Sequence, residues 1–150
     1  MKYHLFTDGA CQPNPGKGGW AFILYPKTHP KKRVIRSGYE AKATNNRMEI
    51  TAVLEGLKYM SRSFNNSPEV TIFADSKYIL QTIESWMKTW VKNDWKRKDN
   101  KSVLNSDLWK QIYNLSENIP ISCIHIKGHS GHPENEECDQ LAVAEIQINK

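Results

Sequence analysis

The stretch Tyr3-His4-Leu5-Phe6-Thr7-Asp8-Gly9 decides how the rest of the chain is interpreted. Its β-favouring residues predict a short strand that carries one carboxylate, Asp8, among apolar and aromatic neighbours. A buried strand rarely accommodates a charge unless that charge is paired or binds a metal. The Gly- and Pro-rich run that follows, residues 9–19, predicts a turn that allows close backbone approach to another group. The sequence must therefore supply a partner for Asp8.

The chain up to residue 62 predicts two more strands and a helix. Strands are expected over Gly18–Tyr25 and Arg33–Tyr39, and the short connections favour an antiparallel meander. A helix follows, with Thr44 or Asn45 as its N-cap. Glu49 lies at the edge of its apolar stripe and is expected to point toward the rim of the core. That stripe comprises Ile50, Val53, Leu54, Leu57 and Met60.

The second half of the chain alternates helices with two strands. The run Glu69–Asp75 is apolar on both faces, which suits a sheet covered by helices, and it delivers Asp75 to a strand–helix junction. Asp139 borders the apolar stripe of the last helix. The remaining expected elements are helices over Ser76–Trp86 and Asp107–Glu117, a strand over Pro120–Lys127, and a helix from about Glu134. This order predicts an α/β or α+β mixed sheet flanked by helices.

Composition narrows the class of protein. The 150 residues are expected to form one domain, residues 1–150, and the formal charge of +5 weakly favours a polyanionic partner. Three cysteines, widely spaced, predict neither a disulfide framework nor a CxxC metal site, so a reduced, cytoplasmic compartment is expected. The apolar runs are too short to span a membrane, and no membrane association is expected.

Four acids stand in four separate elements: Asp8, Glu49, Asp75 and Asp139. Taken singly, two of them have ordinary structural explanations. An acid in a first helical turn, such as Glu49, complements the helix dipole, and Asp75 is equally well explained as an N-cap. Carboxylates cannot compensate one another without a cation between them. Four hard oxygen donors without a Cys/His cluster favour Mg²⁺ or Mn²⁺ over zinc, provided that the four converge.

Several motifs, in order and spacing from residue 3 to about residue 146, make the chain resemble a type 1 ribonuclease H of the compact, single-domain bacterial kind. They are Phe6-Thr7-Asp8-Gly9, Thr44-Asn45-Asn46-Arg47-Met48-Glu49, Asp75-Ser76, Asp107-Leu108-Trp109, and Lys127-Gly128-His129-Ser130-Gly131-His132-Pro133-Glu134-Asn135-Glu136 followed by Cys138-Asp139. The resemblance implies a ribonuclease H-like fold. In that fold a five-stranded mixed sheet, three antiparallel strands and then two parallel ones, is flanked by helices and carries a basic handle.

The resemblance also implies an activity, endonucleolytic hydrolysis of the RNA strand of an RNA–DNA hybrid that leaves 5′-phosphate and 3′-hydroxyl ends. It assigns Asp8, Glu49, Asp75 and Asp139 as catalytic residues that hold two divalent cations, Mg²⁺ with Mn²⁺ as a substitute, about the scissile phosphate. His129 alone would be an ordinary surface histidine. By resemblance it assists proton transfer or product release, with Glu134 as an accessory residue.

By resemblance, a further set of residues binds the hybrid. Those on the minor-groove side would read the 2′-hydroxyl that distinguishes RNA from DNA. Lys42 stands where many family members have Arg, and Lys77 where Gln is common, so both contacts are expected to differ in detail. The whole set is Cys11, Asn14, Lys42, Thr44, Asn45, Asn46, Lys77, Trp86, Trp90, Lys96, Arg97, Lys98 and Asn105, with Glu49 shared between metal and ribose.

The segment 86–105 differs from the rest in composition. It carries six cationic and two anionic residues, a net charge of +4, with Trp86, Trp90 and Trp95 spaced through it. On composition alone, a solvated helix with core tryptophans explains the segment equally well. The resemblance identifies it as the family's basic handle, whose lysines neutralise phosphates while a tryptophan packs on sugars.

Two alternatives remain at this stage. A non-catalytic nucleic-acid-binding module would keep the fold and the handle but lack one of the four acids, and none is missing. An integrase or a reverse-transcriptase-associated domain shares the fold group, but polymerase sequence is absent and the loop with His129 resembles the free-standing enzyme more. The protein is expected to act as a monomer without an obligate protein partner.

Overall fold

A mixed β-sheet forms the centre of the computed structural model, which describes residues 1–127 and 132–149. Among these residues the strand order is β3-β2-β1-β4-β5, with β1, β2 and β3 antiparallel and β4 and β5 parallel to β1. The strands are β1 (Lys2–Gln12), β2 (Gly16–Pro26), β3 (Val34–Ala43), β4 (Glu69–Ala74) and β5 (Ile121–His125). The expected arrangement, three antiparallel strands and then two parallel ones, is confirmed.

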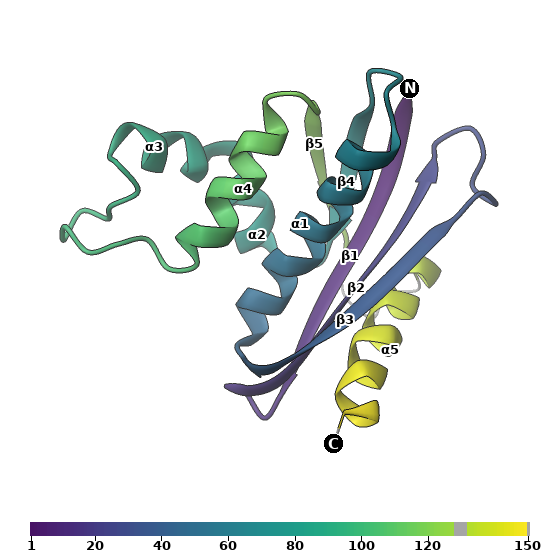
Figure 1. The fold of residues 1–150 in the computed structure, drawn as a ribbon, viewed down its shortest axis with the longest axis horizontal. Helices are drawn as coiled ribbons and strands as arrows, with labels where there is room; N and C mark the ends of the chain where they lie inside the picture. Colours follow the sequence, from purple (N-terminus) through teal and green to yellow (C-terminus); the bar gives the residue numbers. More distant parts are fainter. Residues whose placement is uncertain (128–131, 150) are drawn as a thin grey trace.

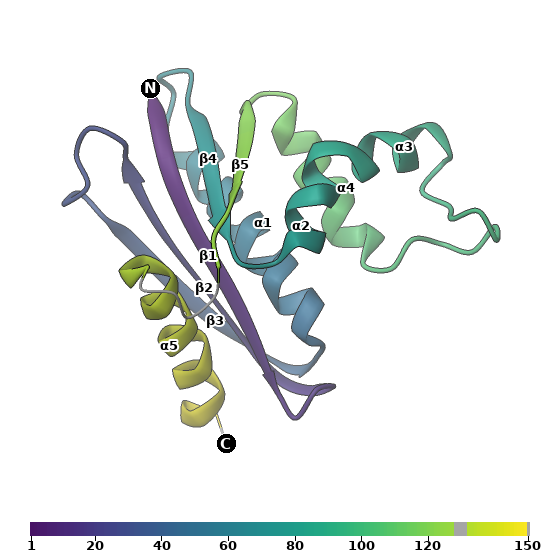
Figure 2. The ribbon, with the colours of Figure 1, turned by 180° about the vertical axis from the view of Figure 1, so that it is seen from behind.

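Helices cover both faces of this sheet. Figures 1 and 2 show α1 against one face, α5 against the other, and α3 with the loop before α4 projecting away from the sheet. The helices are α1 (Asn45–Ser63), α2 (Lys77–Gln81), the π-helix η1 (Thr82–Trp86), α3 (Met87–Lys92), α4 (Ser106–Ser116) and α5 (Pro133–Ile148). No helix in the described part of the chain is long and apolar enough to cross a membrane.

Strand alternation divides the core between the two faces. Successive side chains of a strand point to opposite sides, so Leu5 and Phe6 enter different clusters. Leu5 packs in the cluster that holds the α1 residues Ile50 and Leu54, whereas Phe6 packs in the cluster that holds Cys138 of α5. The two helices that carry predicted acids are therefore fixed to the two faces of the strand that carries Asp8.

The structure corrects three local expectations. The turn predicted over residues 9–19 is confined to the short connection between β1 and β2, because the glycines on either side pair in the antiparallel ladder. Asp75 is not an N-cap: the Ser76 side chain accepts from the backbone N–H of Ile79 and caps α2 instead. The helix expected over Ser76–Trp86 changes to π-helical hydrogen bonding over its last five residues.

Candidate active site

Asp8 lies just beyond the point at which β1 stops pairing with β4. β1 pairs with β4 only from Lys2 to Phe6, whereas its pairing with β2 continues to Gln12. Beyond Phe6 the chain of β4 turns away at Asp75, which leaves the edge of β1 open beside Asp8. Asp8 is 6% exposed, and its Oδ1 accepts a hydrogen bond from the backbone N–H of Gly9 at 2.9 Å. The central strand thus presents a buried acid at a break in the sheet.

Gly9 allows α1 to reach that acid. A Cβ atom at Gly9 would lie 2.5 Å from the backbone of Met48 and Glu49, closer than side chains pack in proteins. The start of α1 therefore crosses directly over β1 and brings Glu49 to the side of Asp8. Glu49 lies just beyond the first turn of α1, and not within it as the sequence predicted, because the helix begins at Asn45. The small residue after Asp8 is needed for this approach, which gives the Asp-Gly pair a structural reason.

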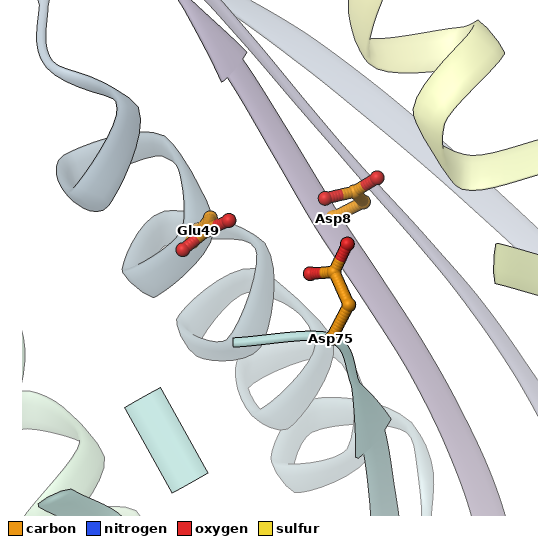
Figure 3. A group of neighbouring side chains, drawn as sticks. All are labelled: Asp8, Glu49 and Asp75. Atoms are coloured by element: carbon orange, nitrogen blue, oxygen red, sulfur yellow. The ribbon is translucent and has the colours of Figure 1, made fainter. Parts of the chain in front are cut away.

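Three carboxylates converge at this point. Asp8, Glu49 and Asp75 each offer an oxygen, and these oxygens lie within 4.8 Å of one another. Figure 3 shows the three side chains pointing into one space between α1, β1 and the end of β4. Ser76, which sequence reasoning did not assign to the site, forms a hydrogen bond with the Glu49 carboxylate. Its capping position was readable from the sequence, whereas its contact with α1 required the fold.

Burial and like charge disfavour ionisation of this acid cluster. Burial, followed by the charge of Asp75, raises the pKa of Asp8 to about 8, although the Gly9 N–H bond opposes the shift. The same two causes raise the pKa of Glu49 to about 7, against the Ser76 hydrogen bond. Such a cluster of hard oxygen donors fits a divalent cation, which would remove the repulsion between carboxylates.

Asp139, the fourth predicted acid, approaches from the other face. It lies half-buried on α5, and its negative charge contributes to raising the pKa of Asp8. Asp139 does not belong to the group of oxygens within 4.8 Å. Gly19 of β2 allows α5 its close approach, because a Cβ there would lie 2.0 Å from the carbonyl oxygen of Ala142. The structure therefore brings three acids together, with Asp139 electrostatically coupled to them.

The β1–β2 turn lies against the start of α1. The Asn14 side chain accepts a hydrogen bond from the backbone N–H of Asn45 at 3.1 Å. The Cys11 thiol points to the carbonyl oxygens of Pro13 and Ala43, at 3.2 and 3.4 Å. Asn46 is exposed in the first turn of α1. The residues predicted to read the RNA strand therefore share one rim, close in sequence to Asp8 and Glu49.

Lys42, Thr44 and Asn105 line one open pocket of about 380 Å³, and Arg47 contributes to the same wall. Thr44 is the N-cap of α1, since its Oγ1 accepts from the backbone N–H of Arg47. The sequence motif that contains Arg47 does not reveal its role, because its polar contacts are with α4, about sixty residues further along the chain. The pocket gathers hydrogen-bond donors from three separate segments.

The handle, residues 86–105, is part helix and part loop. Trp86 is 43% exposed at the end of η1, whereas Trp90 is partly buried against Trp95 and Trp109. Trp90 and Trp95 pack against the main core, so these two tryptophans match the structural explanation that composition left open. Lys96, Arg97 and Lys98 line an open hollow of about 330 Å³ on the loop. Lys77 is exposed at the first residue of α2.

Two further predicted site residues are His129 and Glu134. His129 falls outside the described residues. Glu134 lies half-buried in the first turn of α5, where its charge raises the pKa of Tyr25 and opposes the lowering of the His4 pKa. Glu134 is thus placed beside β1 and β2, on the α5 face of the sheet.

Comparisons with known proteins identify the family. Residues 1–147 match the sequence model of the family described as RNase H. The curated ribonuclease H of a Thermoanaerobacter species is 42% identical over 146 residues, which cover 97% of this chain and 90% of that relative. The chain therefore spans nearly the full length of this relative.

Two solved structures have the same fold. LC9-RNase H1, described as a type 1 RNase H with the type 2 active-site motif, superimposes with a TM-score of 0.83 at 24% identity, over 99% of this chain and 74% of that one. LC11-RNase H1 in complex with an RNA/DNA hybrid gives a TM-score of 0.74 at 20% identity, over 98% of each chain. From the family match, the curated relative and this fold, the chain belongs to the ribonuclease H family, as an enzyme of the type 1 bacterial kind.

Proposed function

We propose that this ribonuclease H cuts the RNA strand of RNA–DNA hybrids by two-metal-ion catalysis and leaves 5′-phosphate and 3′-hydroxyl ends. The observation that carries the proposal is the convergence of Asp8, Glu49 and Asp75 within 4.8 Å at the open edge of β1. One buried and two half-buried carboxylates are costly to hold ionised together without a cation. Residues 1–150 act in this proposal as one catalytic domain, monomeric and cytoplasmic, without an obligate protein partner.

The three converging acids would hold Mg²⁺, with Mn²⁺ as a substitute, and Asp139 would complete the set from α5. When bound, the cations supply activation of the attacking water and stabilisation of the charge that develops on the departing 3′ oxygen. The chain itself contributes rigid placement: Gly9 keeps Glu49 beside Asp8, and the Ser76 hydrogen bond restrains the Glu49 carboxylate. Placement of this kind limits reorganisation during the reaction.

The rim formed by Cys11, Asn14, Asn45 and Asn46 would receive the RNA strand. Recognition of a 2′-hydroxyl needs donors and acceptors held close to the ribose, and a backbone turn fixed by the Asn14–Asn45 hydrogen bond supplies such a surface. The related LC11-RNase H1 was solved with an RNA/DNA hybrid, which supports the same class of substrate here. Selection of RNA for cleavage would then follow from contacts next to the acid cluster.

The DNA strand would lie along a separate set of hydrogen-bond donors and cationic side chains. Lys42, Thr44 and Asn105 would hold a phosphate in their shared pocket, and Lys77 would contact the hybrid near the acids. Trp86, with its exposed indole, would pack on the sugars, while the partly buried Trp90 would support it from beneath. Lys96, Arg97 and Lys98 would neutralise phosphates further along the handle.

His129 and Glu134 would assist near the scissile bond. The role of His129 in proton transfer or product release rests on the family motif between Lys127 and Asp139. A histidine is suited to it because its unperturbed pKa lies near neutrality. Replacing His129 with Ala is expected to lower kcat by about a hundredfold with little change in KM, as for a lost general acid or base.

One experiment tests the activity. The same base sequence is offered to the protein as RNA–DNA, RNA–RNA and DNA–DNA duplexes, each with Mg²⁺ and with EDTA, and the labelled products are sized and end-mapped. We expect cleavage only of the RNA strand of the hybrid, only with Mg²⁺, and products that ligate or extend as 5′-phosphate and 3′-hydroxyl ends do. Cleavage in EDTA, or equal cleavage of the RNA–RNA duplex, would contradict the proposal.

A further inference from the structure

Arg47 joins the first turn of α1 to the start of α4. Its Nη1 donates to Asn105 Oδ1 at 3.1 Å and to Asp107 Oδ1 at 3.2 Å, and its Nη2 donates to Asp107 Oδ2 at 2.8 Å. Glu40 of β3 lies on the remaining side, with its carboxylate 3.7 Å from Arg47 Nε. The guanidinium is therefore held by a two-pronged pair with Asp107, a geometry that lysine cannot reproduce.

This arrangement fixes which way the Asn105 amide faces. A guanidinium can only donate, so the atom of Asn105 that meets Arg47 must be the carbonyl oxygen. The amide nitrogen, which carries two hydrogens, then points away from Arg47. Asn105 also stands at the N-cap position of α4, where an asparagine usually turns its oxygen toward the helix N–H groups. Here it makes no such bond: the backbone of Asn105 is left-handed, with φ 59°, and its side-chain oxygen accepts from Arg47 instead.

The orientation matters for the pocket that Lys42, Thr44, Arg47 and Asn105 line. Thr44 Oγ1 accepts from the Arg47 N–H, which leaves the hydroxyl hydrogen to donate elsewhere. The positive charge of Arg47 is met by Asp107 and Glu40. An anion in this pocket would therefore be held by donors of Thr44, Lys42 and the Asn105 amide, and Arg47 would act on it indirectly.

We propose that Arg47 and Asp107 are positioning residues, which hold the Asn105 amide in the orientation that donates to a phosphodiester group of the hybrid's DNA strand. This inference rests on the proposed function, because it takes the hybrid as the ligand. In this role neither the Arg47 guanidinium nor the Asp107 carboxylate contacts the phosphate or acts on the reacting atoms. Their effect is on binding, through a side-chain amide that would otherwise be free to rotate.

An explanation based on local charge alone predicts the opposite effect of an Asp107 substitution on hybrid binding. Asp107 is an acid beside a pocket for an anion, so replacing it with a neutral residue would improve binding if only the local field mattered. If Asp107 acts by holding Arg47, and Arg47 by holding Asn105, the same replacement weakens binding despite the gain in positive charge. The sign of the change therefore separates the two explanations.

The test measures binding of a fluorescently labelled RNA–DNA hybrid by anisotropy in EDTA, together with KM and kcat for its cleavage in Mg²⁺. Asp107→Asn is expected to raise Kd and KM about fivefold with kcat unchanged, the loss expected for one hydrogen bond. Glu40→Gln is the matched control: it removes the same charge beside Arg47 without breaking the two-pronged pair, and it should leave Kd unchanged or lower. Arg47→Lys keeps the charge and should raise Kd as Asp107→Asn does.

A double variant shows whether the effect passes through Asn105. In the Asn105→Ala background, adding Asp107→Asn should produce no further rise in Kd, since there is no amide left to orient. Circular dichroism of each variant establishes folding, and Arg47→Lys carries the test if Asp107→Asn does not fold.

Two outcomes would overturn parts of this account separately. A wild-type protein that binds and cleaves the hybrid, with Asp107→Asn binding as tightly as Glu40→Gln or more tightly, would overturn the positioning role alone. A wild-type protein that neither binds nor cleaves the hybrid would overturn the proposed function, and the positioning role with it.

Discussion

The start of α1 contributes to two regions in which the charges are balanced in opposite ways. On one side Glu49 joins Asp8 and Asp75, and burial with like charge raises the pKa values of Asp8 and Glu49. On the other side, only two residues earlier, the Arg47 hydrogen bond holds the pKa of the Asp107 carboxyl below its usual range. The acid cluster is incomplete within the chain, whereas the Arg47 cluster is internally balanced.

This difference indicates what each region lacks. The acids lack cations that would balance their charge. The ligands of a metal site are in the same state before the metal ions bind. The charges of the Arg47 cluster are already paired with one another. Its hydrogen bonds can therefore orient a neighbouring side chain, that of Asn105. Together the two proposals give the start of α1 one site that binds cations through unpaired acids and a second site that binds a phosphate through oriented donors.

The largest expected effect comes from removing one acid of the incomplete cluster. Asp8→Asn should lower kcat for hybrid cleavage in Mg²⁺ by at least about a thousandfold, because a central carboxylate of the cation site is lost. Single-turnover cleavage of a labelled hybrid measures it. Full activity in this folded variant would contradict the assignment of Asp8.

The same substitution should stabilise the metal-free protein. Asp8 has a folded pKa of about 8 against an ordinary value of 3.8, so the folded state binds more protons between these values and its free energy of unfolding falls as pH rises from about 4 to 8. Asp8→Asn should remove most of this fall, a gain on the order of 3 kcal/mol at pH 8.

Urea unfolding in EDTA at pH 5 and pH 8 checks this expectation. The wild type should be less stable at pH 8 than at pH 5, and the variant should show a smaller difference. Equal pH dependence in the two proteins would mean that Asp8 carries no such charge penalty.

The close crossing of α1 over β1 can be broken without changing any charge. Gly9→Ala places a methyl group 2.5 Å from the backbone of Met48 and Glu49, which must move the helix start. We expect a loss of about 2 kcal/mol in stability and at least about a tenfold lower kcat.

Gly56→Ala provides the control for this displacement. Its Cβ would meet only the end of the Leu5 side chain, at 2.8 Å, further along the same helix. Thermal unfolding and cleavage rates of the two variants are compared. The account requires that Gly56→Ala keeps its kcat while Gly9→Ala does not.

The smallest of these effects concerns the handle. Neutralising Lys96, Arg97 and Lys98 to Gln should raise KM about tenfold and reduce the slope of log KM against log salt by about one to three, since phosphate contacts release counterions. Cleavage assays over a range of salt concentrations measure both quantities.

The β2–β3 hairpin supplies a control with the same loss of charge. Lys27, Lys31 and Lys32 lie near the start of β1, since Lys27 donates its backbone N–H to the Lys2 carbonyl. Their neutralisation should leave KM and its salt slope nearly unchanged. Equal effects from the two triple variants would show that net charge, rather than the handle, governs binding.

Much of this architecture could be predicted from local patterns. The alternation around Asp8, the helix stripe after Glu49 and the strand ending at Asp75 gave elements of the right type, with ends displaced by a few residues. The chain's resemblance to a ribonuclease H supplied the order of the sheet. The sequence indicated Asp75 as a candidate N-cap of α2, whereas Ser76 takes that position in the structure. Local pattern could not separate them, because aspartate and serine both favour the N-cap.

The remainder depended on contacts between distant segments. Nothing local shows that Gly9 admits α1, that Ser76 bonds to Glu49, or that Arg47 holds Asn105 across some sixty residues. The convergence of three acids follows from the early end of β4 beside β1, a feature of strand register rather than of any motif. Sequence therefore identified the chemistry of the residues, and the fold determined their partners.

Proton release on Mg²⁺ binding tests the cation site most directly. At pH 7 the Asp8 carboxyl, with a pKa of about 8, is mostly protonated, so metal binding must displace its proton. Titration calorimetry in two buffers of different ionisation enthalpy counts the protons. Glu49, with a pKa of about 7, is half protonated at the same pH, so we expect release of between one and two protons per protein in the wild type, and weak binding with release of no more than about half a proton in Asp8→Asn. Binding without proton release in the wild type, or equal binding by the variant, would contradict this account.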